Sequence, residues 1–350
     1  MRSKFSLIAF VAALIAFQPI SASAQIQELV IKFIGQSNLE ANSSLLEKPF
    51  FEKLTEKSAG KIKVDLQPFN TIGLNGSEVL RLMKSGVLEW ASNGINYLSG
   101  DRAEFEGCDL AGLTSTLDEV YKACAAYKPV LARLMADNWN AKLLGLQVNH
   151  PQVIWCRAPT KGLADLRGKK IRVYNKTLID FTEGVGATSV SIPFAEVVPA
   201  LQRGVADCAV SGSFNGNIAN FPEVAPHILG VSLGWAPNYI AVNLNVWNKL
   251  NAATQKFLEE QFLEMEKESF TRVSVRTTAE GVNCNTGKEC LLGKKVTIQY
   301  VTPTAEDEKE RLRIMRETVV PRWAKRCGAK CAEIWNETVG KAVNLTAPTN

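Results

Sequence analysis

The stretch that decides the fold lies near the middle of this 350-residue chain and reads LADLRGKKIRV, from Leu163 to Val173. Within it, Asp165 favours a turn or a cap, Gly168 permits a tight turn, and residues 170–173 predict a strand. Arg172 is therefore expected inside a strand and close to its end. A guanidinium there presents paired donors to a planar carboxylate, which makes Arg172 a candidate anion-binding residue; a structural arginine is the alternative.

Strands and short helices alternate on both sides of this stretch. Downstream, residues 190–192 and 207–210 predict strands that flank a helix at 195–203. Upstream, apolar or alternating patterns predict five more strands, at 29–35, 62–69, 90–95, 143–148 and 153–156. Such alternation predicts an α/β architecture with largely parallel sheets.

The C-terminal third carries helical patterns instead. Residues 252–278 form one long amphipathic pattern, which as a helix crosses about 40 Å at a rise of ~1.5 Å per residue. That length exceeds one small domain, so the helix is expected to brace two. Residues 305–344 are again mostly helical, with a break near Pro321.

The middle segment resembles the solute-binding proteins of TRAP (tripartite ATP-independent periplasmic) transporters. Members typically show a DL-K/R-G-x-K-I-R strand, a GA step followed by E-V, and an AL-x-x-G-x-x-D turn. The corresponding segments here are Asp165–Arg172, Gly186–Val197 and Ala200–Asp207. The resemblance implies an α/β, two-lobed periplasmic-binding-protein clamshell of the type II kind, with a long bracing helix and a helical C-terminus.

The domain organisation that we expect follows from these patterns and the resemblance. His150-Pro151 breaks two strands and is the candidate lobe crossover. The expected parts are a signal peptide at 1–24, a first lobe at 25–149 completed by about 238–275, a second lobe at 150–237 completed by part of 276–304, and C-terminal helices at 305–350.

The resemblance also implies site residues in the second lobe. Arg172 matches the arginine that grips the ligand carboxylate, Asn175 and Ser211 match polar contacts, and Phe194 matches an apolar wall. Relatives that bind sialic acid carry a second cleft arginine about twenty positions before the first, where this chain has His150-Pro151-Gln152. Gln152 is therefore the candidate for that place, and whether a second arginine contacts the ligand stays open.

Further candidates follow from position in the predicted sheets. Residues at the carboxyl ends of strands line the crevice of such folds, which favours Gln36, Asn38 and Asn93 in the first lobe. Phe214 is a candidate aromatic wall of the cleft. Each of these residues has a structural alternative, as a turn residue or as part of the core.

The N-terminus predicts export. Arg2 and Lys4 precede an apolar run at 5–17, and Ala22-Ser23-Ala24 offers small residues for cleavage after Ala24. The pattern is typical of a secretory signal peptide, and the run is too short to span ~30 Å of hydrocarbon comfortably. We therefore expect a periplasmic protein.

Export changes the interpretation of the eight cysteines, all of which follow residue 24. In an oxidising compartment they form up to four disulfides, although eight cysteines allow 105 connectivities and metal binding is an alternative. Short loops favour Cys284–Cys290 and Cys327–Cys331. Cys108–Cys124 and Cys156–Cys208 are then the expected remaining pairs.

The composition restricts the function classes. The chain is 46% hydrophobic and 21% charged with a net charge of +5 and dispersed basic residues, which argues against disorder and against nucleic-acid binding. Only two histidines are present, His150 and His227, and no GxSxG, HExxH or P-loop occurs, so no metal, cofactor or catalytic residue is predicted.

The leading hypothesis is an extracytoplasmic receptor that captures a small carboxylate between its lobes and delivers it to TRAP membrane subunits. The alternatives are a binding protein of an ATP-driven importer or of a sensor, and an exported enzyme that acts on organic acids.

Overall fold

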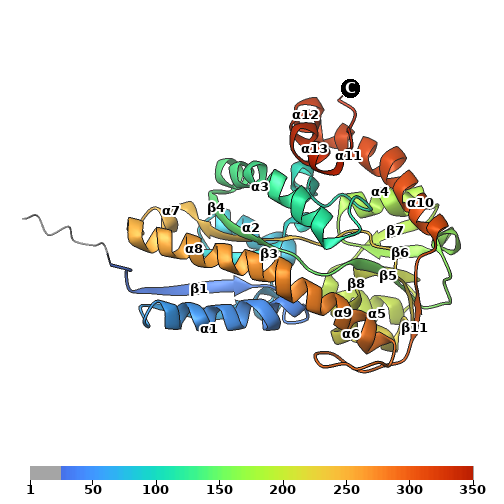
Figure 1. Cartoon of the computed structure of the whole chain (residues 1–350), viewed down its shortest axis with the longest axis horizontal. Coiled ribbons are helices and arrows are strands. Elements are labelled where there is room, and N and C mark those ends of the chain that lie inside the picture. The colour runs from blue at the N-terminus through green and yellow to red at the C-terminus, as the bar shows by residue number, and fades with distance from the viewer. Residues whose placement is uncertain (1–24, 350) are drawn as a thin grey trace, which may run out of the picture.

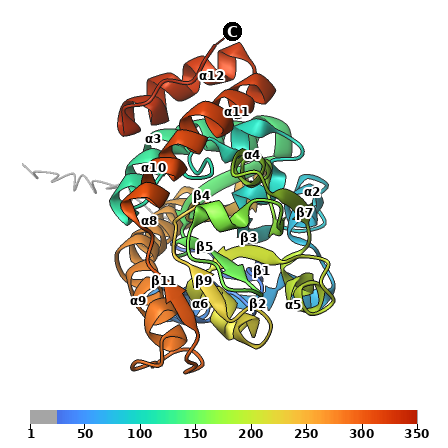
Figure 2. The ribbon, with the colours of Figure 1, turned by 90° about the vertical axis from the view of Figure 1, so that its right-hand side faces the viewer.

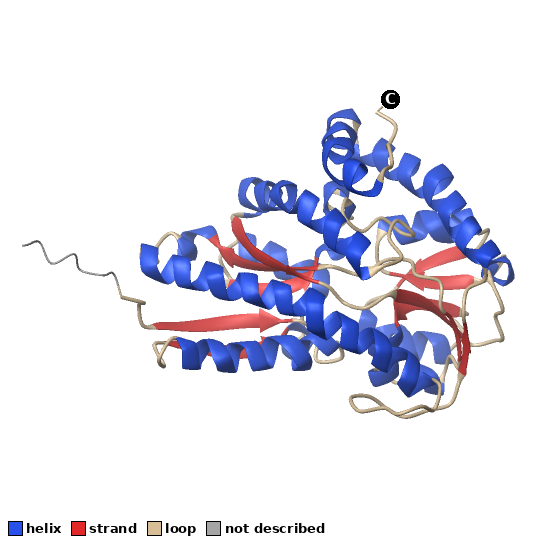
Figure 3. Cartoon of the chain, viewed as in Figure 1, coloured by secondary structure: helices blue, strands red, loops and turns tan. Residues whose placement is uncertain are grey.

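The computed structural model describes residues 25–349, so the predicted signal peptide lies outside the described residues. Two β-sheets lie side by side and form the centres of two α/β lobes (Figures 1 and 3). The first sheet has the order β2 (Ile62–Pro68), β1 (Leu29–Gly35), β3 (Trp90–Gly94), β10 (Asn238–Asn243) and β4 (Ala141–Gln147). The second has the order β11 (Gln299–Val301), β9 (His227–Leu229), β5 (Gln152–Cys156), β8 (Cys208–Gly212), β6 (Lys170–Val173) and β7 (Thr188–Ser191). The predicted α/β class and two-lobed fold are confirmed.

Both sheets are mixed. The expectation of largely parallel sheets fails for one strand in each sheet, which runs antiparallel to its neighbours. Strand β10 runs antiparallel to β3 and β4, and β5 runs antiparallel to β8 and β9. These are the two strands that the chain enters directly after passing from one sheet to the other. A chain that arrives at the edge where the parallel strands end has to run back along them, so each entering strand is reversed.

A long helix runs across both lobes, as Figure 1 shows in orange. It consists of α8 (Ala252–Glu268), one wider π-helical turn (Ser269–Val273) and α9 (Ser274–Asn285), together 34 residues. Asn251 caps its start, because the Asn251 side-chain oxygen accepts a hydrogen bond from the amide of Thr254 (2.8 Å). The predicted bracing helix is confirmed and extends seven residues beyond the predicted end at 278.

The remaining helices cover the sheets and the top of the molecule. They are α1 (Lys48–Lys57), α2 (Gly76–Lys84), α3 (Leu117–Trp139) and α7 (Leu244–Trp247) beside the first sheet; α4 (Lys176–Gly184), α5 (Val197–Gln202) and α6 (Ser213–Ile218) beside the second; and α10 (Ala305–Ile314), α11 (Val320–Cys327), α12 (Ala329–Trp335) and α13 (Lys341–Val343) at the C-terminus. None of the helices within residues 25–349 is both long enough and apolar enough to cross a membrane.

Aromatic side chains fill the lobe cores. In the first lobe Phe50, Phe51 and Phe262 pack around the fully buried Trp90, so the long helix is held to the sheet by its own Phe262. In the second lobe, Trp155 packs edge-on against Phe221. Large buried rings contribute most of the apolar area in such cores.

The C-terminal helices bind to both lobes. Figure 2 shows α11 and α12 above α3 and α4. Trp323 donates to the carbonyl of Ala103 (2.8 Å), while Arg326 contacts Asp180 of α4 at 2.6 Å and Glu106 at 3.8 Å. Glu106 also accepts a hydrogen bond from the amide of Thr177 at the start of α4 (2.9 Å). The segment around residue 106, α4 and α11 are thereby fixed to one another.

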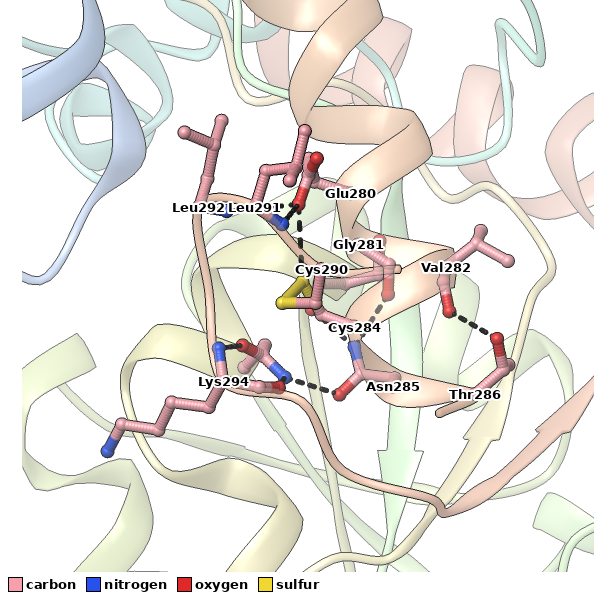
Figure 4. The surroundings of a disulfide bond; sticks show 12 residues. Glu280, Gly281, Val282, Cys284, Asn285, Thr286, Cys290, Leu291, Leu292 and Lys294 are labelled. Carbon is pink, nitrogen blue, oxygen red and sulfur yellow. Dashed lines mark hydrogen bonds between the residues drawn. A yellow bond between two sulfur atoms is a disulfide. The ribbon is translucent and has the colours of Figure 1, made fainter. Parts of the chain in front are cut away.

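Four disulfides are present, and they are the four predicted pairs: Cys108–Cys124, Cys156–Cys208, Cys284–Cys290 and Cys327–Cys331. Cys156 and Cys208 are directly opposite each other on β5 and β8. Figure 4 shows Cys284–Cys290 at the end of the long helix, where the Glu280 carboxylate accepts hydrogen bonds from the amides of Leu291 (2.9 Å) and Leu292 (3.2 Å). The helix end and the following loop are thus joined covalently and by hydrogen bonds.

The disulfides join cysteines at different separations along the chain. Removing them is therefore expected to lower the unfolding free energy by different amounts. Closing the 52-residue separation of Cys156–Cys208 restricts the unfolded chain by about 4 kcal/mol, against about 2 kcal/mol for the 4-residue separation of Cys327–Cys331. We expect the Cys156→Ala/Cys208→Ala protein to lose more unfolding free energy than Cys327→Ala/Cys331→Ala. Urea denaturation followed by tryptophan fluorescence measures both. Equal losses, or the reverse order, would contradict the chain-entropy argument.

Candidate functional site

A cavity lies between the two sheets, at the edge where the parallel strands of both sheets end. It has about 450 Å³ of space not occupied by atoms, part of it open to solvent. The chain crosses between the lobes in two crossover segments, residues 148–152 after β4 and residues 230–237 after β9. The residues that line the cavity are Glu40, Gly94, Asn96, Tyr97 and Asn238 from the first lobe; Asn149, Gln152, Ala236 and Pro237 from the two crossover segments; and Arg172, Tyr174, Phe194, Ser211 and Asn215 from the second lobe.

Arg172 is the basic residue of this cavity and is only 1% exposed. Its Nε donates to the carbonyl of Ile192 (2.8 Å) and its Nη1 to the carbonyl of Val210 (3.0 Å). The rings of Tyr174 and Phe194 lie 5.4 and 5.9 Å from the guanidinium carbon. The remaining nitrogen, Nη2, is buried without a hydrogen-bond partner. Burial lowers the pKa of Arg172, and the neighbouring Tyr97, Tyr174 and Glu40 act in the opposite direction.

Glu40 lines the cavity from the first lobe and is 9% exposed. Burial raises the pKa of its carboxyl to about 8, the charge of Glu47 adds to the rise, and the charge of Arg172 opposes it. The next residue, Ala41, donates its amide to the side-chain oxygen of Asn215 in the second lobe (3.0 Å). Glu40 is therefore held at the junction of the lobes.

The two crossover segments form a short hydrogen-bonded ladder beneath the cavity. The amide of Asn149 donates to the carbonyl of Trp235 (3.1 Å), that of Gln152 to Gly234 (2.8 Å), and that of Leu233 to Gln152 (2.8 Å). The long helix is bonded to the same place, because the Ser269 hydroxyl accepts from the amide of Val148 (2.9 Å).

His150 fixes this hinge to the second lobe. Its Nε2 accepts hydrogen bonds from the amides of Phe214 and Asn215 at the start of α6, both at 3.1 Å. An accepting Nε2 requires the neutral ring with its proton on Nδ1, and burial lowers the pKa of His150 to about 3. A Cβ at Gly212 would lie 2.2 Å from Nε2, so the ring can occupy this place only beside a glycine.

Four of the predicted site residues line the cavity: Arg172, Gln152, Phe194 and Ser211. Arg172 and Ser211 lie near the ends of neighbouring strands, and Gln152 begins the strand that enters from the hinge. Arg157, the arginine nearest in sequence to the place of a second cleft arginine, is exposed and is not among the lining residues.

The other predicted residues do not line the cavity. Asn175 caps α4 by accepting a hydrogen bond from the amide of Leu178 (2.8 Å). Phe214 packs against Ala41 and Cys284 beneath the cleft. Both side chains are thus committed to local structure.

The first-lobe candidates likewise have structural partners. Gln36 donates to the side chain of Gln147, Asn38 is paired with Asn70 (2.8 Å), and Asn93 donates to the carbonyl of Gly76 (3.0 Å). Asn93 and Gly94 are successive strand residues, which point to opposite sides of the sheet, and Gly94 is the one at the cavity.

Several lining residues were not predicted from the sequence: Glu40, Asn96, Tyr97, Asn149, Tyr174, Asn215 and Asn238. Tyr174 follows strand β6 directly and Asn238 begins β10, so strand ends were an available signal for these two. Glu40 and Tyr97 lie in connections, and the sequence pattern did not indicate that they approach the second lobe.

The possible metal ligands that the structure gathers are not among the residues that line this cavity. Within residues 25–349, the acidic and sulfur ligand atoms of Glu280, Cys284 and Cys290 lie within 4.8 Å of one another. The two sulfurs are joined as a disulfide, so they are not thiolate ligands.

Comparison with known proteins identifies the family. The family described as bacterial extracellular solute-binding protein, family 7, matches residues 39–310. The chain belongs to this family, which comprises the solute-binding proteins of TRAP transporters. Family 7 proteins are extracytoplasmic and non-enzymatic, in agreement with the predictions from sequence.

Curated relatives and solved structures agree with this assignment. The 2,3-diketo-L-gulonate-binding periplasmic protein YiaO of Escherichia coli is 26% identical over 260 residues, 71% of this chain and 75% of the relative. A TRAP solute-binding protein of Desulfovibrio salexigens with bound orotic acid has a TM-score of 0.78 at 19% identity, covering 89% of this chain and 99% of that one. DctP6 of Bordetella pertussis, a receptor binding pyroglutamic acid, has a TM-score of 0.79 at 20% identity, covering 90% and 99%.

The neutral, buried His150 predicts a specific pH dependence of stability. Because its pKa falls from 6.5 in the unfolded chain to about 3 in the folded protein, the stabilisation that it contributes is complete above pH 6.5 and declines as the pH falls. Between pH 7 and pH 5 the wild type should lose about 2 kcal/mol more unfolding free energy than His150→Gln, which cannot be protonated. Urea denaturation of both proteins at the two pH values measures this difference, and groups common to both cancel. If wild type and His150→Gln differed in unfolding free energy by the same amount at pH 7 and pH 5, the assignment of a neutral His150 ring would be wrong.

Proposed function

We propose that this family 7 protein captures a small carboxylate between its two lobes, with Arg172 as the carboxylate anchor, and delivers it to TRAP-type membrane subunits. The observation that carries the proposal is the buried and unpartnered Nη2 of Arg172, which lines the cavity between the lobes. Gln152 and Ser211 are the proposed polar contacts beside it, and Phe194 is the proposed apolar wall.

The donors already used by Arg172 support this role. Nε and Nη1 are bonded to the main-chain carbonyls of Ile192 and Val210, which fixes the plane of the guanidinium. A fixed guanidinium retains its geometry when the ligand arrives, so little side-chain entropy is lost on binding. An unpaired buried donor is costly, and a carboxylate oxygen would satisfy it.

The ligands of similar proteins support the carboxylate class. Solved structures with this fold hold L-gulonate in a Haemophilus influenzae protein and succinate in a Shewanella oneidensis protein. The ligands named in these structures, like orotic and pyroglutamic acid in the structures above, each carry a carboxylate.

The proposed mechanism needs no covalent chemistry. The first lobe carries Glu40, Asn96 and Tyr97, and the second carries Arg172 and Ser211, so a ligand held between them contacts both lobes. A ligand that binds both lobes stabilises the closed arrangement, which is the form that the membrane subunits would recognise.

Replacing Arg172 tests the anchor. Arg172→Lys keeps a positive charge but loses the planar pair of donors, so we expect affinity for the bound carboxylate to fall roughly 10- to 100-fold. A thermal-shift screen of carboxylates first identifies a ligand, since a ligand bound only by the native state raises the melting temperature. Calorimetric titration then compares the variant with wild type.

The matched control is Arg157→Lys, which changes an exposed arginine of the same lobe and should leave affinity unchanged. Circular dichroism establishes that both variants are folded. A folded Arg172→Lys protein with wild-type affinity for the carboxylate would overturn the anchor assignment.

A further inference from the structure

Among the buried carboxylates of residues 25–349, Glu40 differs in that its carboxyl group has no hydrogen-bond partner. Glu47 accepts from the amide of Gln36 (3.0 Å) and from Gln147 (3.2 Å). Asp109 accepts from the amides of Trp235 (3.0 Å) and Ala236 (2.9 Å).

Two more buried carboxylates have partners of the same kind. Glu106 accepts from the amide of Thr177 (2.9 Å), and Glu280 from that of Leu291 (2.9 Å). For Glu40, in contrast, no donor among the described residues hydrogen-bonds the carboxyl group, and what acts on it is burial and the charges of Glu47 and Arg172. A buried carboxylate without a donor is unfavourable unless a partner arrives from outside the chain.

The place of Glu40 indicates what that partner is. Glu40 and Arg172 line the same cavity, Glu40 from the first lobe and Arg172 from the second, and the charge of Arg172 acts on the Glu40 carboxyl group. The bond from the amide of Ala41 to Asn215 holds the Glu40 segment to the second lobe (3.0 Å). An acceptor and a cationic donor therefore face one small space, and each lacks a partner within the chain.

We infer that Glu40 is a second ligand-binding group, which accepts a hydrogen bond from an N–H of the ligand, so that the ligand class is a small carboxylate that also carries a nitrogen donor. This inference rests on the proposed function, because it takes the ligand carboxylate to lie at Arg172. A ligand with an ammonium or a ring N–H satisfies both groups at once. The second carboxylate of a dicarboxylate would instead be repelled once Glu40 is ionised, which holds above its pKa of about 8.

The size of the site agrees with a compact ligand. The cavity has at most about 450 Å³ of space not occupied by atoms, and part of that is open to solvent. Amino and lactam carboxylates with a five-membered ring bring their two polar groups close together. They are therefore suitable probes for a site whose acceptor and donor share one cavity.

The test is calorimetric titration with two matched pairs of ligands. L-Proline is compared with cyclopentanecarboxylate, and L-pyroglutamate with its lactone analogue 5-oxotetrahydrofuran-2-carboxylate; within each pair only the N–H is replaced, at similar size. We expect the wild type to prefer at least one N–H ligand by about 10- to 100-fold over its counterpart. Which pair shows the preference distinguishes an ammonium from a lactam N–H as the donor.

Glu40→Gln supplies the second measurement. The amide keeps the size of the side chain and an acceptor oxygen but removes the charge, so at pH 9 the preference for the ammonium ligand L-proline should fall at least tenfold while the nitrogen-free ligand keeps its affinity. The control is Glu56→Gln, an exposed residue of α1 in the same lobe, which should change neither affinity.

The pH dependence adds a readout that a merely structural role would not change. Binding through an ionised Glu40 requires loss of its proton, so affinity of the wild type for the N–H ligand should rise from pH 6 to pH 9, with the pKa of the empty site at about 8. The groups that act on Glu40 are Glu47 and Arg172, with Tyr97 and Tyr174 nearby. They are present in Glu40→Gln as well, so the difference between the two pH profiles isolates Glu40.

The possible failures can be told apart. If nitrogen-free carboxylates or succinate bind as tightly as the N–H ligands, depend on Arg172 and are indifferent to Glu40→Gln, the inference is wrong and the proposed function stands. If no carboxylate of the panel binds, both the inference and the anchor assignment are overturned.

Discussion

The burial of one guanidinium is the constraint on which the binding region depends. Removing a cation from water costs several kcal/mol unless other groups replace its hydration. Arg172 receives two main-chain carbonyls, from Val210 on β8 and Ile192 just after β7, which are the strands on either side of β6. Two aromatic rings lie beside the guanidinium. The ends of three adjacent strands thus serve to hold one charged group, and they leave its last nitrogen without a hydrogen-bond partner.

The hinge is built so that the two sheets keep a defined relation to this group. The two crossover segments are hydrogen-bonded to each other, the long helix is bonded to the first of them through Ser269, and His150 is bonded to the start of α6. Each of these hydrogen bonds has a main-chain atom as donor or acceptor, so the bonds fix the path of the main chain through the hinge. Only Gly212 leaves room for the His150 ring. A closing motion that keeps these bonds has to be a rotation of whole lobes, because neither crossover can move independently.

The sequence contains more information about the fold than about the site. Strands such as β1 were predictable because a buried strand is a short apolar run, and the four disulfides because two short loops left few pairings for the rest. Arg172 and Ser211 were predictable as strand-end residues. Gln36 and Asn93 were also placed correctly at strand ends, but their amides bond within the first lobe, which depends on side-chain direction and on tertiary neighbours. Glu40 and Tyr97 reach the cavity only because the lobes meet, and no local pattern encodes that approach.

The opposite charges of Arg172 and Glu40 also bear on how the empty protein tolerates a polar cavity. An ionised pair held apart in a poorly solvated space is unfavourable, and a carboxyl with a pKa of about 8 avoids this by retaining its proton near neutral pH. The empty cavity then carries the single charge of Arg172, which favours the approach of an anion. Once the ligand carboxylate has neutralised that charge, an N–H beside Glu40 makes its ionised form favourable. Binding of a nitrogen-bearing carboxylate would thus release the proton of Glu40. Glu40 would then select among ligands only after Arg172 has bound the ligand carboxylate.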